Sequence, residues 1–269
     1  MPNLSDHPRN PSREYSPAFQ ALLSARPYPV DRPVFDHTTE HRTQRLNRAF
    51  ARAFQDRLPW CTTTSRCGLW SCPSCRVELR DLFAAETEET MIKHGPLTAW
   101  EAVTIVPGFG RTKIGALPVG GLRAFKAKVQ RKIRNVASEA IGYFCIDVSW
   151  ERRLNGEEHW QWHVHGTMRG LNETMRKKIR ASFKLGERSA DKPVQFKRIT
   201  RDDTGGLMVA GLLEYAAKAN FLLREPRNEH CSSYRTSGPQ ERSLNYDQEI
   251  ELMRVLCNFK TKQRIFRIG

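Results

Sequence analysis

Segment 160–166, Trp-Gln-Trp-His-Val-His-Gly, constrains the fold more than any other part of this chain. Apolar and polar side chains alternate along it, and successive side chains of a β-strand point to opposite faces of a sheet. The alternation therefore predicts a strand with one apolar face, which carries both tryptophans, and one polar face. His163 and His165 share the polar face, so two imidazoles are expected side by side on one sheet surface.

A second alternating strand, residues 142–153, precedes this one and is predicted to form a hairpin with it. Joining the two apolar faces requires residues of even number to pair with even, and odd with odd. A two-residue turn at Asn155-Gly156 breaks this match. A three-residue turn that pairs Leu154 with Glu158 keeps it, and this is the register we predict.

The predicted register places a carboxylate beside the histidines, with Asp147 opposite His165 and Ser149 opposite His163. Asp147 is therefore the first candidate for a third metal ligand. Glu151, on the same face but nearer the turn, is the alternative. Imidazole and carboxylate together suit a divalent ion such as Mn²⁺ or Mg²⁺. The competing interpretation is a solvent-facing histidine pair on a basic sheet.

Tyr215 and Lys218 lie at positions i and i+3 of a predicted helix, 207–223, and so share one of its faces. A tyrosine there offers a nucleophile, and the lysine offers a cation to steady a phosphate or favour the tyrosinate. Taken alone, this spacing is also typical of an ordinary amphipathic helix with a half-buried tyrosine.

His163-Val-His165 followed by Tyr215-Ala-Ala-Lys218 resembles the HUH endonuclease superfamily, in particular the rolling-circle replication initiators of plasmids and some phages. The resemblance covers roughly residues 98–225, with strand 102–106 in the place of the family's first motif. Asp147 stands where many members use Glu, and the hairpin is longer than is usual.

The resemblance implies a five-stranded antiparallel sheet flanked by helices. It also implies a metal that polarises the scissile phosphate while Tyr215 attacks it. The products would be a 5′-phosphotyrosine link and a free 3′-hydroxyl that primes rolling-circle replication. No second tyrosine stands beside Tyr215, which favours plasmid-type initiators over relaxases and transposases with paired tyrosines.

Four cysteines, Cys61, Cys67, Cys72 and Cys75, lie within fifteen residues. The Cys72-Pro-Ser-Cys75 spacing is that of a zinc knuckle, although the first pair is wider than usual. We predict a tetrahedral Zn²⁺ site, with reduced free cysteines as the alternative. Cys145, Cys231 and Cys257 are expected to be unpaired packing residues.

The formal net charge of +15 favours a polyanionic partner, most simply DNA with a single-stranded or cruciform origin, over a merely solvated basic surface. The candidate phosphate contacts lie on two predicted basic helices, 122–138 and 171–185. They are Arg123, Lys126, Arg131 and Arg134 on the first, and Arg176, Lys177, Lys178 and Arg180 on the second. Trp160 and Trp162 are expected to pack in the core rather than stack on bases.

Strands and helices alternate without a strict βαβ rhythm, which indicates an α+β fold with a mostly antiparallel sheet. We divide the chain into a polar basic segment (1–57), a zinc module with its helix (58–94), a nuclease domain (95–225) and a C-terminal extension (226–269). The sequence shows neither a signal peptide nor an apolar stretch long enough to cross a membrane, so a cytoplasmic protein is expected.

Three hypotheses follow: a nicking and joining enzyme that starts replication, an HUH transposase or relaxase, and a non-catalytic zinc-containing DNA-binding regulator. The chain contains no phosphate-binding loop of the helicase type. The first hypothesis therefore requires a host helicase and polymerase as partners.

Overall fold

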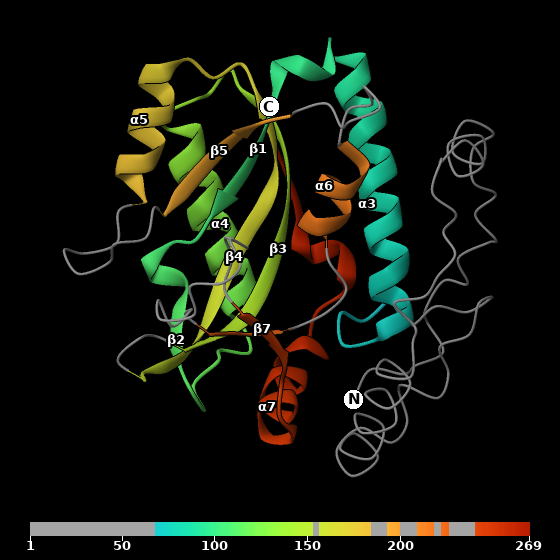
Figure 1. Cartoon of the computed structure of the whole chain (residues 1–269), viewed down its shortest axis with the longest axis vertical. Helices are drawn as coiled ribbons and strands as arrows, with labels where there is room; N and C mark the ends of the chain where they lie inside the picture. Colours follow the sequence, from blue (N-terminus) through green and yellow to red (C-terminus); the bar gives the residue numbers. More distant parts are fainter. Residues whose placement is uncertain (1–67, 153–155, 184–192, 200–208, 218–221, 226–239) are drawn as a thin grey trace, which may run out of the picture.

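The computed structural model describes residues 68–152, 156–183, 193–199, 209–217, 222–225 and 240–269 (Figure 1). The helices are α3 (Pro73–Lys93), α4 (Gly121–Arg134), α5 (Glu173–Ser182), α6 (Val209–Ala216) and α7 (Tyr246–Leu256). The strands are β1 (Trp100–Ile105), β2 (Arg111–Lys113), β3 (Ile141–Arg152), β4 (Glu158–Arg169), β5 (Val194–Arg198), β6 (Leu222–Glu225), β7 (Gln240–Ser243) and β8 (Ile265–Ile268). Single 3₁₀ turns are η2 (Leu97–Ala99), η3 (Gly108–Gly110) and η4 (Thr261–Arg264).

The described strands form one sheet in the order β5-β1-β4-β3-β6-β7, with β2 also beside β4 and β8 also beside β3. Its pairs are antiparallel except for the short parallel contact between β3 and β6. The prediction of an α+β fold with a mostly antiparallel sheet is confirmed. The two long strands of the hairpin, β3 and β4, lie in the middle of the sheet, where both of their edges are paired.

The hairpin keeps the predicted even-with-even pairing, but its register was predicted wrongly by two residues. Glu158 pairs with Arg152 rather than Leu154. The guanidinium of Arg152 binds the Glu158 carboxylate, with 2.6 Å between Nε and Oε1. One pair further in, Trp150 packs edge-on against Trp160 with ring centroids 4.8 Å apart. A cross-strand pair of opposite charge stabilises a register by about 0.2–1 kcal/mol, and the Arg152–Glu158 pair favours the longer loop.

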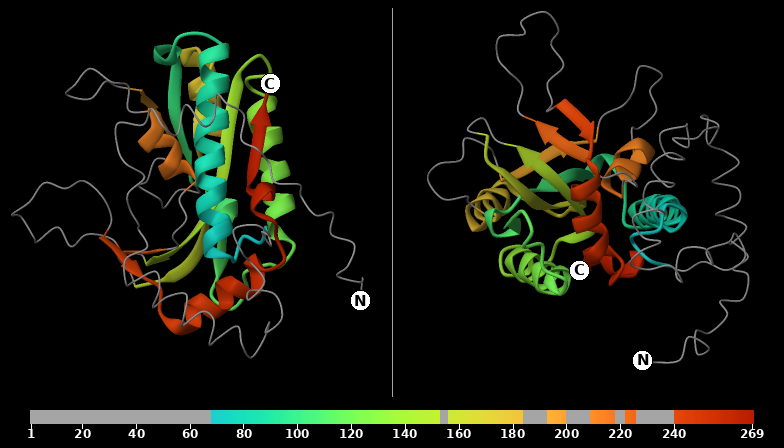
Figure 2. Two further views of the ribbon diagram at one scale, coloured as in Figure 1. Left: turned by 90° about the vertical axis from the view of Figure 1, so that its right-hand side faces the viewer. Right: turned by 90° about the horizontal axis from the view of Figure 1, so that it is seen from below.

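The two faces of the sheet carry separate apolar cores, whereas the alternation predicted one apolar and one polar face. Both tryptophans of segment 160–166 are buried in the larger core, together with the apolar sides of α4, α5 and α7. The smaller core lies on the opposite face, which we call the histidine face, and is formed with α3 and α6. Figure 2 shows α4 and α6 on opposite sides of the sheet.

Helix positions follow their local signals. The apolar side of α4 is buried through Leu122, Phe125, Val129 and Ile133, as its spacing predicts. Asn172 caps α5 by accepting a hydrogen bond from the Met175 amide at 2.8 Å. This cap fixes where α5 begins.

The predicted segment 1–57 lies outside the described residues. Among the helices that the structure describes, none combines the length and the apolar character needed to cross a bilayer.

Candidate functional site

His163 and His165 lie on β4, between β1 and β3, and both point to the histidine face. Their side chains are almost fully buried, with relative exposures of 1% and 3%. The two rings are nearly parallel, at 10°, with centroids 5.8 Å apart. The alternative of a solvent-facing histidine pair does not describe this arrangement.

His163 is held by two oxygen-bearing side chains of β3. Its Nε2 lies 2.6 Å from Ser149 Oγ and 2.9 Å from Glu151 Oε1. The Ser149 hydroxyl donates to the same Glu151 oxygen at 3.2 Å. Both oxygens therefore lie within hydrogen-bond distance of His163 Nε2, which is directed at Ser149 and Glu151.

His165 is oriented from the other neighbouring strand. Thr104 on β1 is its partner in the register, and Thr104 Oγ1 hydrogen-bonds His165 Nδ1 at 3.2 Å. A hydrogen bond to one ring nitrogen fixes the orientation of an imidazole and directs its other nitrogen. The threonine thus acts on His165 as Ser149 and Glu151 act on His163.

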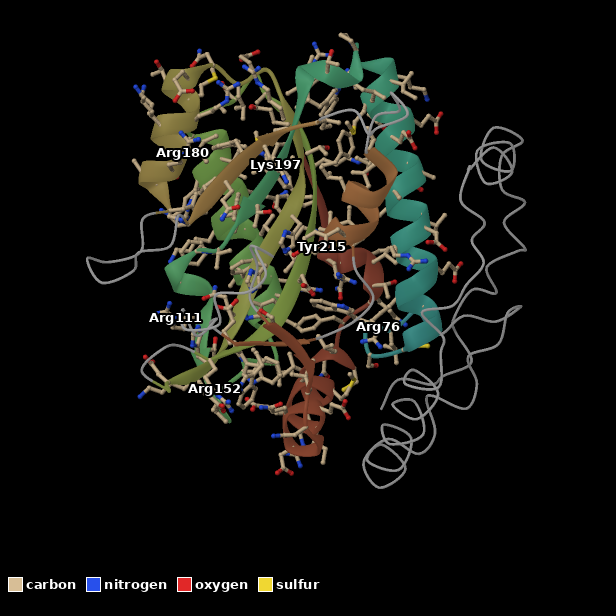
Figure 3. The ribbon with its side chains drawn as sticks, in the orientation of Figure 1. Arg76, Arg111, Arg152, Arg180, Lys197 and Tyr215 are labelled. Atoms are coloured by element: carbon tan, nitrogen blue, oxygen red, sulfur yellow. The ribbon has the colours of Figure 1, made fainter. Side chains whose placement is uncertain are left out.

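Tyr215 reaches the histidines from α6. Three side chains of this helix, Val209, Leu213 and Ala216, are buried in the core of the histidine face, and this packing places α6 against the sheet. The Tyr215 ring contacts the His165 ring in an edge-on arrangement, with centroids 5.3 Å apart and an interplanar angle of 75°. About half of the tyrosine side chain is exposed (49%), so a ligand can approach it. Figure 3 shows Tyr215 near the middle of this face.

Lys218, the predicted cationic partner of Tyr215, lies outside the described residues. The predicted helix 207–223 corresponds to Val209–Ala216 in the described part of the chain.

Both candidate carboxylates adjoin the histidine pair, although not as the predicted register had it. Asp147 is fully buried and lies opposite His163, not His165, whose partner in β3 is Cys145. Glu151 lies opposite His159 and reaches diagonally to His163. Its other oxygen, Oε2, lies 3.7 Å from His159 Nε2. The measured contact makes Glu151 the carboxylate best placed to share a ligand with His163.

The donor set fits a divalent ion, whereas the present side-chain arrangement does not enclose one. Among the described residues, no group of three or more His, Cys, Asp or Glu side chains is arranged to hold a metal. Two ligand atoms at right angles around an octahedral ion with bonds of about 2.1 Å are about 3.0 Å apart. The 2.9 Å between His163 Nε2 and Glu151 Oε1 agrees with this separation. A cation bound at His163 Nε2 would meet the same two oxygens.

Cys145 lies on the same face next to Asp147 and is not a nucleophile. Burial raises the pKa of its thiol to about 11, and the Asp147 charge adds to this, against the lowering effect of Arg264. The thiol is therefore protonated at neutral pH. Cys145 and Cys257 are buried packing residues, as predicted, whereas Cys231 lies outside the described residues.

The described half of the cysteine cluster lies where α3 begins. Cys72 is the N-cap residue and Cys75 is in the first turn, and both side chains are buried. The Gly68 amide donates to Cys75 Sγ at 3.2 Å. Cys61 and Cys67 lie outside the described residues, so the four-thiolate zinc site stays a prediction.

The predicted DNA-binding helices α4 and α5 cover the face opposite the histidines. Several of their cations are also engaged within the protein. Lys126 Nζ donates to the carbonyls of Ile265 (2.6 Å) and Gln263 (3.3 Å), and burial lowers its pKa. Arg176 pairs with Glu101 at 2.9 Å, and the pKa of its guanidinium is raised by this bond. Arg180 lies over the Phe196 ring. Five of the proposed residues are exposed cations in no such contact: Arg123, Arg131, Arg134, Lys177 and Lys178.

The sequence interpretation missed cations that lie on the histidine face itself. Lys197 on β5 pairs with Ala102 of β1, and Lys113 on β2 pairs with His159, so both share the face of the histidines. Both are exposed. The alternation of residues 194–198 was a usable signal for Lys197. The position of Lys113 had no such signal, because it depends on the pairing of β2 with β4. Strand β2 has only three residues and follows a 3₁₀ turn.

No family model matches the chain, and neither the curated proteins nor the solved structures include one with significant similarity to it.

Proposed function

We propose that this protein is a metal-dependent DNA strand transferase of the HUH type that nicks and rejoins single-stranded origin DNA to start rolling-circle plasmid replication. The observation that carries the proposal is the contact of the Tyr215 ring with the His165 ring at 5.3 Å. A half-exposed phenol thus adjoins a buried histidine pair with a carboxylate beside it. This combination of nucleophile and metal-ligand chemistry suits a phosphodiester substrate.

In the proposed reaction, the Tyr215 oxygen attacks the scissile phosphorus. The new bond joins the tyrosine oxygen to phosphorus, and the bond from phosphorus to the 3′-oxygen breaks. The phenol loses its proton and the departing 3′-oxygen gains one. The 5′-phosphate then stays on the protein, and attack by a 3′-hydroxyl reverses the step without ATP.

The chain's own residues would prepare this step by positioning. His163, His165 and Glu151, with Asp147 as the alternative carboxylate, would hold Mn²⁺ or Mg²⁺, whose charge would polarise the scissile phosphate. Thr104 and Ser149 would keep the two imidazoles in their orientation.

Single-stranded DNA would cross the half of the histidine face that lies away from α3. That half carries Lys197 and Lys113, whereas α3 contains more acidic than basic residues. Phosphates contacted by these lysines would lead the strand past Tyr215.

The decisive test is a covalent adduct on a denaturing gel. The full-length protein is incubated with Mn²⁺ and a pool of single-stranded oligonucleotides of degenerate sequence, labelled at the 3′ end. A 5′-phosphotyrosine link retains the 3′ portion of the cut strand, so label should migrate with the protein.

Tyr215→Phe should abolish the adduct and His163→Ala should severely reduce it. Tyr143→Phe is the matched control, since Tyr143 is a buried tyrosine of the same face. An adduct that survives in Tyr215→Phe removes this residue from the proposed role. DNA retardation with no adduct from the unaltered protein would instead support the non-catalytic regulator.

A further inference from the structure

The exposed side of α4 is strongly basic and lies on the far face of the sheet from Tyr215. The helix contains six cationic residues and no acidic one: Arg123, Lys126, Lys128, Arg131, Lys132 and Arg134. Among the described residues, none of the six forms an ion pair. The positive charge of α4 is therefore not neutralised by the described part of the protein.

Three of the six contact uncharged groups of the protein, which orient the cation without neutralising it. Lys126 donates to backbone carbonyls of the C-terminal segment, and Lys132 donates to the Ser182 carbonyl at the end of α5 at 2.6 Å. Lys128 lies 4.2 Å from the centre of the Phe109 ring. Carbonyls and an aromatic ring orient an ammonium group without cancelling it.

The other three, Arg123, Arg131 and Arg134, point outward and are exposed. At 100° per residue they lie within an arc of about 80° on the helix, and the exposed Ala127 lies between them in this arc. Its small side chain leaves room for a phosphate backbone to approach the helix. Arg123 and Arg134 are about 16 Å apart along the axis, which corresponds to about five base pairs of duplex.

We infer that this surface, the exposed arginines of α4, binds the phosphate backbone of double-stranded DNA. It is a second DNA-binding site, separate from the strand that reaches Tyr215. Duplex is favoured over single-stranded DNA because proteins bind single strands by stacking bases on aromatic side chains. In the described part of the chain the exposed large apolar side chains are Ile92, Ile114, Val119 and Tyr215, and none of them is on α4. The surface offers charge without stacking.

The charge of the opposite face agrees with this assignment. Helix α3, which covers part of the histidine face, has five acidic residues against three basic ones: Glu78, Asp81, Glu86, Glu88 and Glu89 against Arg76, Arg80 and Lys93. A duplex, with two charged backbones, is repelled from that side and attracted to α4. A protein bound to duplex through α4 would present Tyr215 on its other side to DNA that has become single-stranded.

The test compares the salt dependence of duplex binding in two triple variants of the full chain. The first is Arg123→Gln/Arg131→Gln/Arg134→Gln. The matched control, Lys93→Gln/Arg254→Gln/Lys262→Gln, removes the same charge from exposed positions on α3, α7 and η4. Binding of a fluorescent duplex of about 30 base pairs is followed by anisotropy over a series of KCl concentrations. Thermal unfolding verifies that both variants are folded.

Each phosphate contact contributes about 0.9 to the slope of log K against log salt. The α4 variant should therefore show a slope shallower by about 2.7, and the control a change of less than about one. Equal slopes in the two variants would overturn the inference. So would unaltered protein that binds single strands of equal length as tightly as duplex.

The same α4 variant should form the Tyr215 adduct on a short single strand as the unaltered protein does, and loss of the adduct would refute the separation of the two sites. Absence of the adduct from unaltered protein would refute the proposed function alone, because the duplex measurement does not depend on cleavage.

Discussion

Replacement of Glu151 by Gln should weaken binding of Mn²⁺ more than replacement of Asp147 by Asn. Glu151 Oε1 already lies 2.9 Å from His163 Nε2, the separation of adjacent ligand atoms around an octahedral ion. Gln has the same shape but no charge, so it keeps the packing and loses the anionic ligand. Asp147 is fully buried beside the same histidine, so its replacement by the isosteric Asn is the matched comparison.

Removing a group that only orients a metal ligand lowers metal affinity by about 10–100-fold. Glu151→Gln removes a ligand itself, so its effect should be at least as large. We therefore expect a loss of about 100-fold, equivalent to about 3 kcal/mol. Asp147→Asn should cost about tenfold or less, because we expect the Asp147 side chain to contribute no contact to the ion.

Free Mn²⁺ measured by electron paramagnetic resonance during a titration gives the affinity without reference to cleavage. A large loss in Asp147→Asn together with an unchanged affinity in Glu151→Gln would refute the assignment of Glu151. No Mn²⁺ binding by the unaltered protein would refute the metal site as a whole.

Three further changes test single contacts. Thr104→Val removes the hydrogen bond to His165 Nδ1 at nearly constant volume and should lower Mn²⁺ affinity by about 10-fold, with an unchanged unfolding midpoint; an unchanged affinity would show that packing alone orients the ring. Lys197→Gln should reduce the salt slope of single-strand binding by about 0.7, whereas Lys93→Gln should not; equal slopes would exclude Lys197 from the path of the strand. The Cys145 thiol has a pKa of about 11 in the fold, above the unfolded value, so the unfolded chain loses this proton first as pH rises. Stability should therefore fall by about 1 kcal/mol per pH unit between about pH 8.5 and 11, relative to Cys145→Ala in denaturant titrations, and parallel curves for the two proteins would contradict the shift.

The alternation of polar and apolar residues in the sequence was sufficient to predict the two faces of the hairpin. It predicted that Trp160 and Trp162 are buried and that His163 and His165 lie together on the other face, because a strand's side-chain period is fixed at two. It could not predict which of the registers that pair even residues with even residues the hairpin adopts. The observed register gains the Arg152–Glu158 pair and accepts a longer loop, and such a pair is worth only about 0.2–1 kcal/mol.

The site was predictable as a list of residues but not as a set of contacts. Tyr215 is fifty residues from the histidines in sequence, and its position depends on how α6 packs on the core of the histidine face. Ser149 and Thr104 were not chosen as site residues because hydroxyl side chains carry no pattern of their own. The basic helix 122–138 was predicted from the spacing of its apolar residues, whereas the side of the sheet that it covers is a property of the chain's connections.

The location of α4 shows that the cations of the protein are divided between the two faces of the sheet. Had all the cations gathered near Tyr215, one surface would have had to bind both duplex and single-stranded DNA. Instead the basic helix covers the apolar face, and the histidine face carries separate exposed lysines on β2 and β5, with the acidic α3 along its other side. Under the two proposals, duplex and single-stranded DNA are bound independently, on opposite faces of one sheet. Substitutions on the two faces should accordingly be additive in binding free energy, since the structure describes no side-chain contact between the two sets of residues.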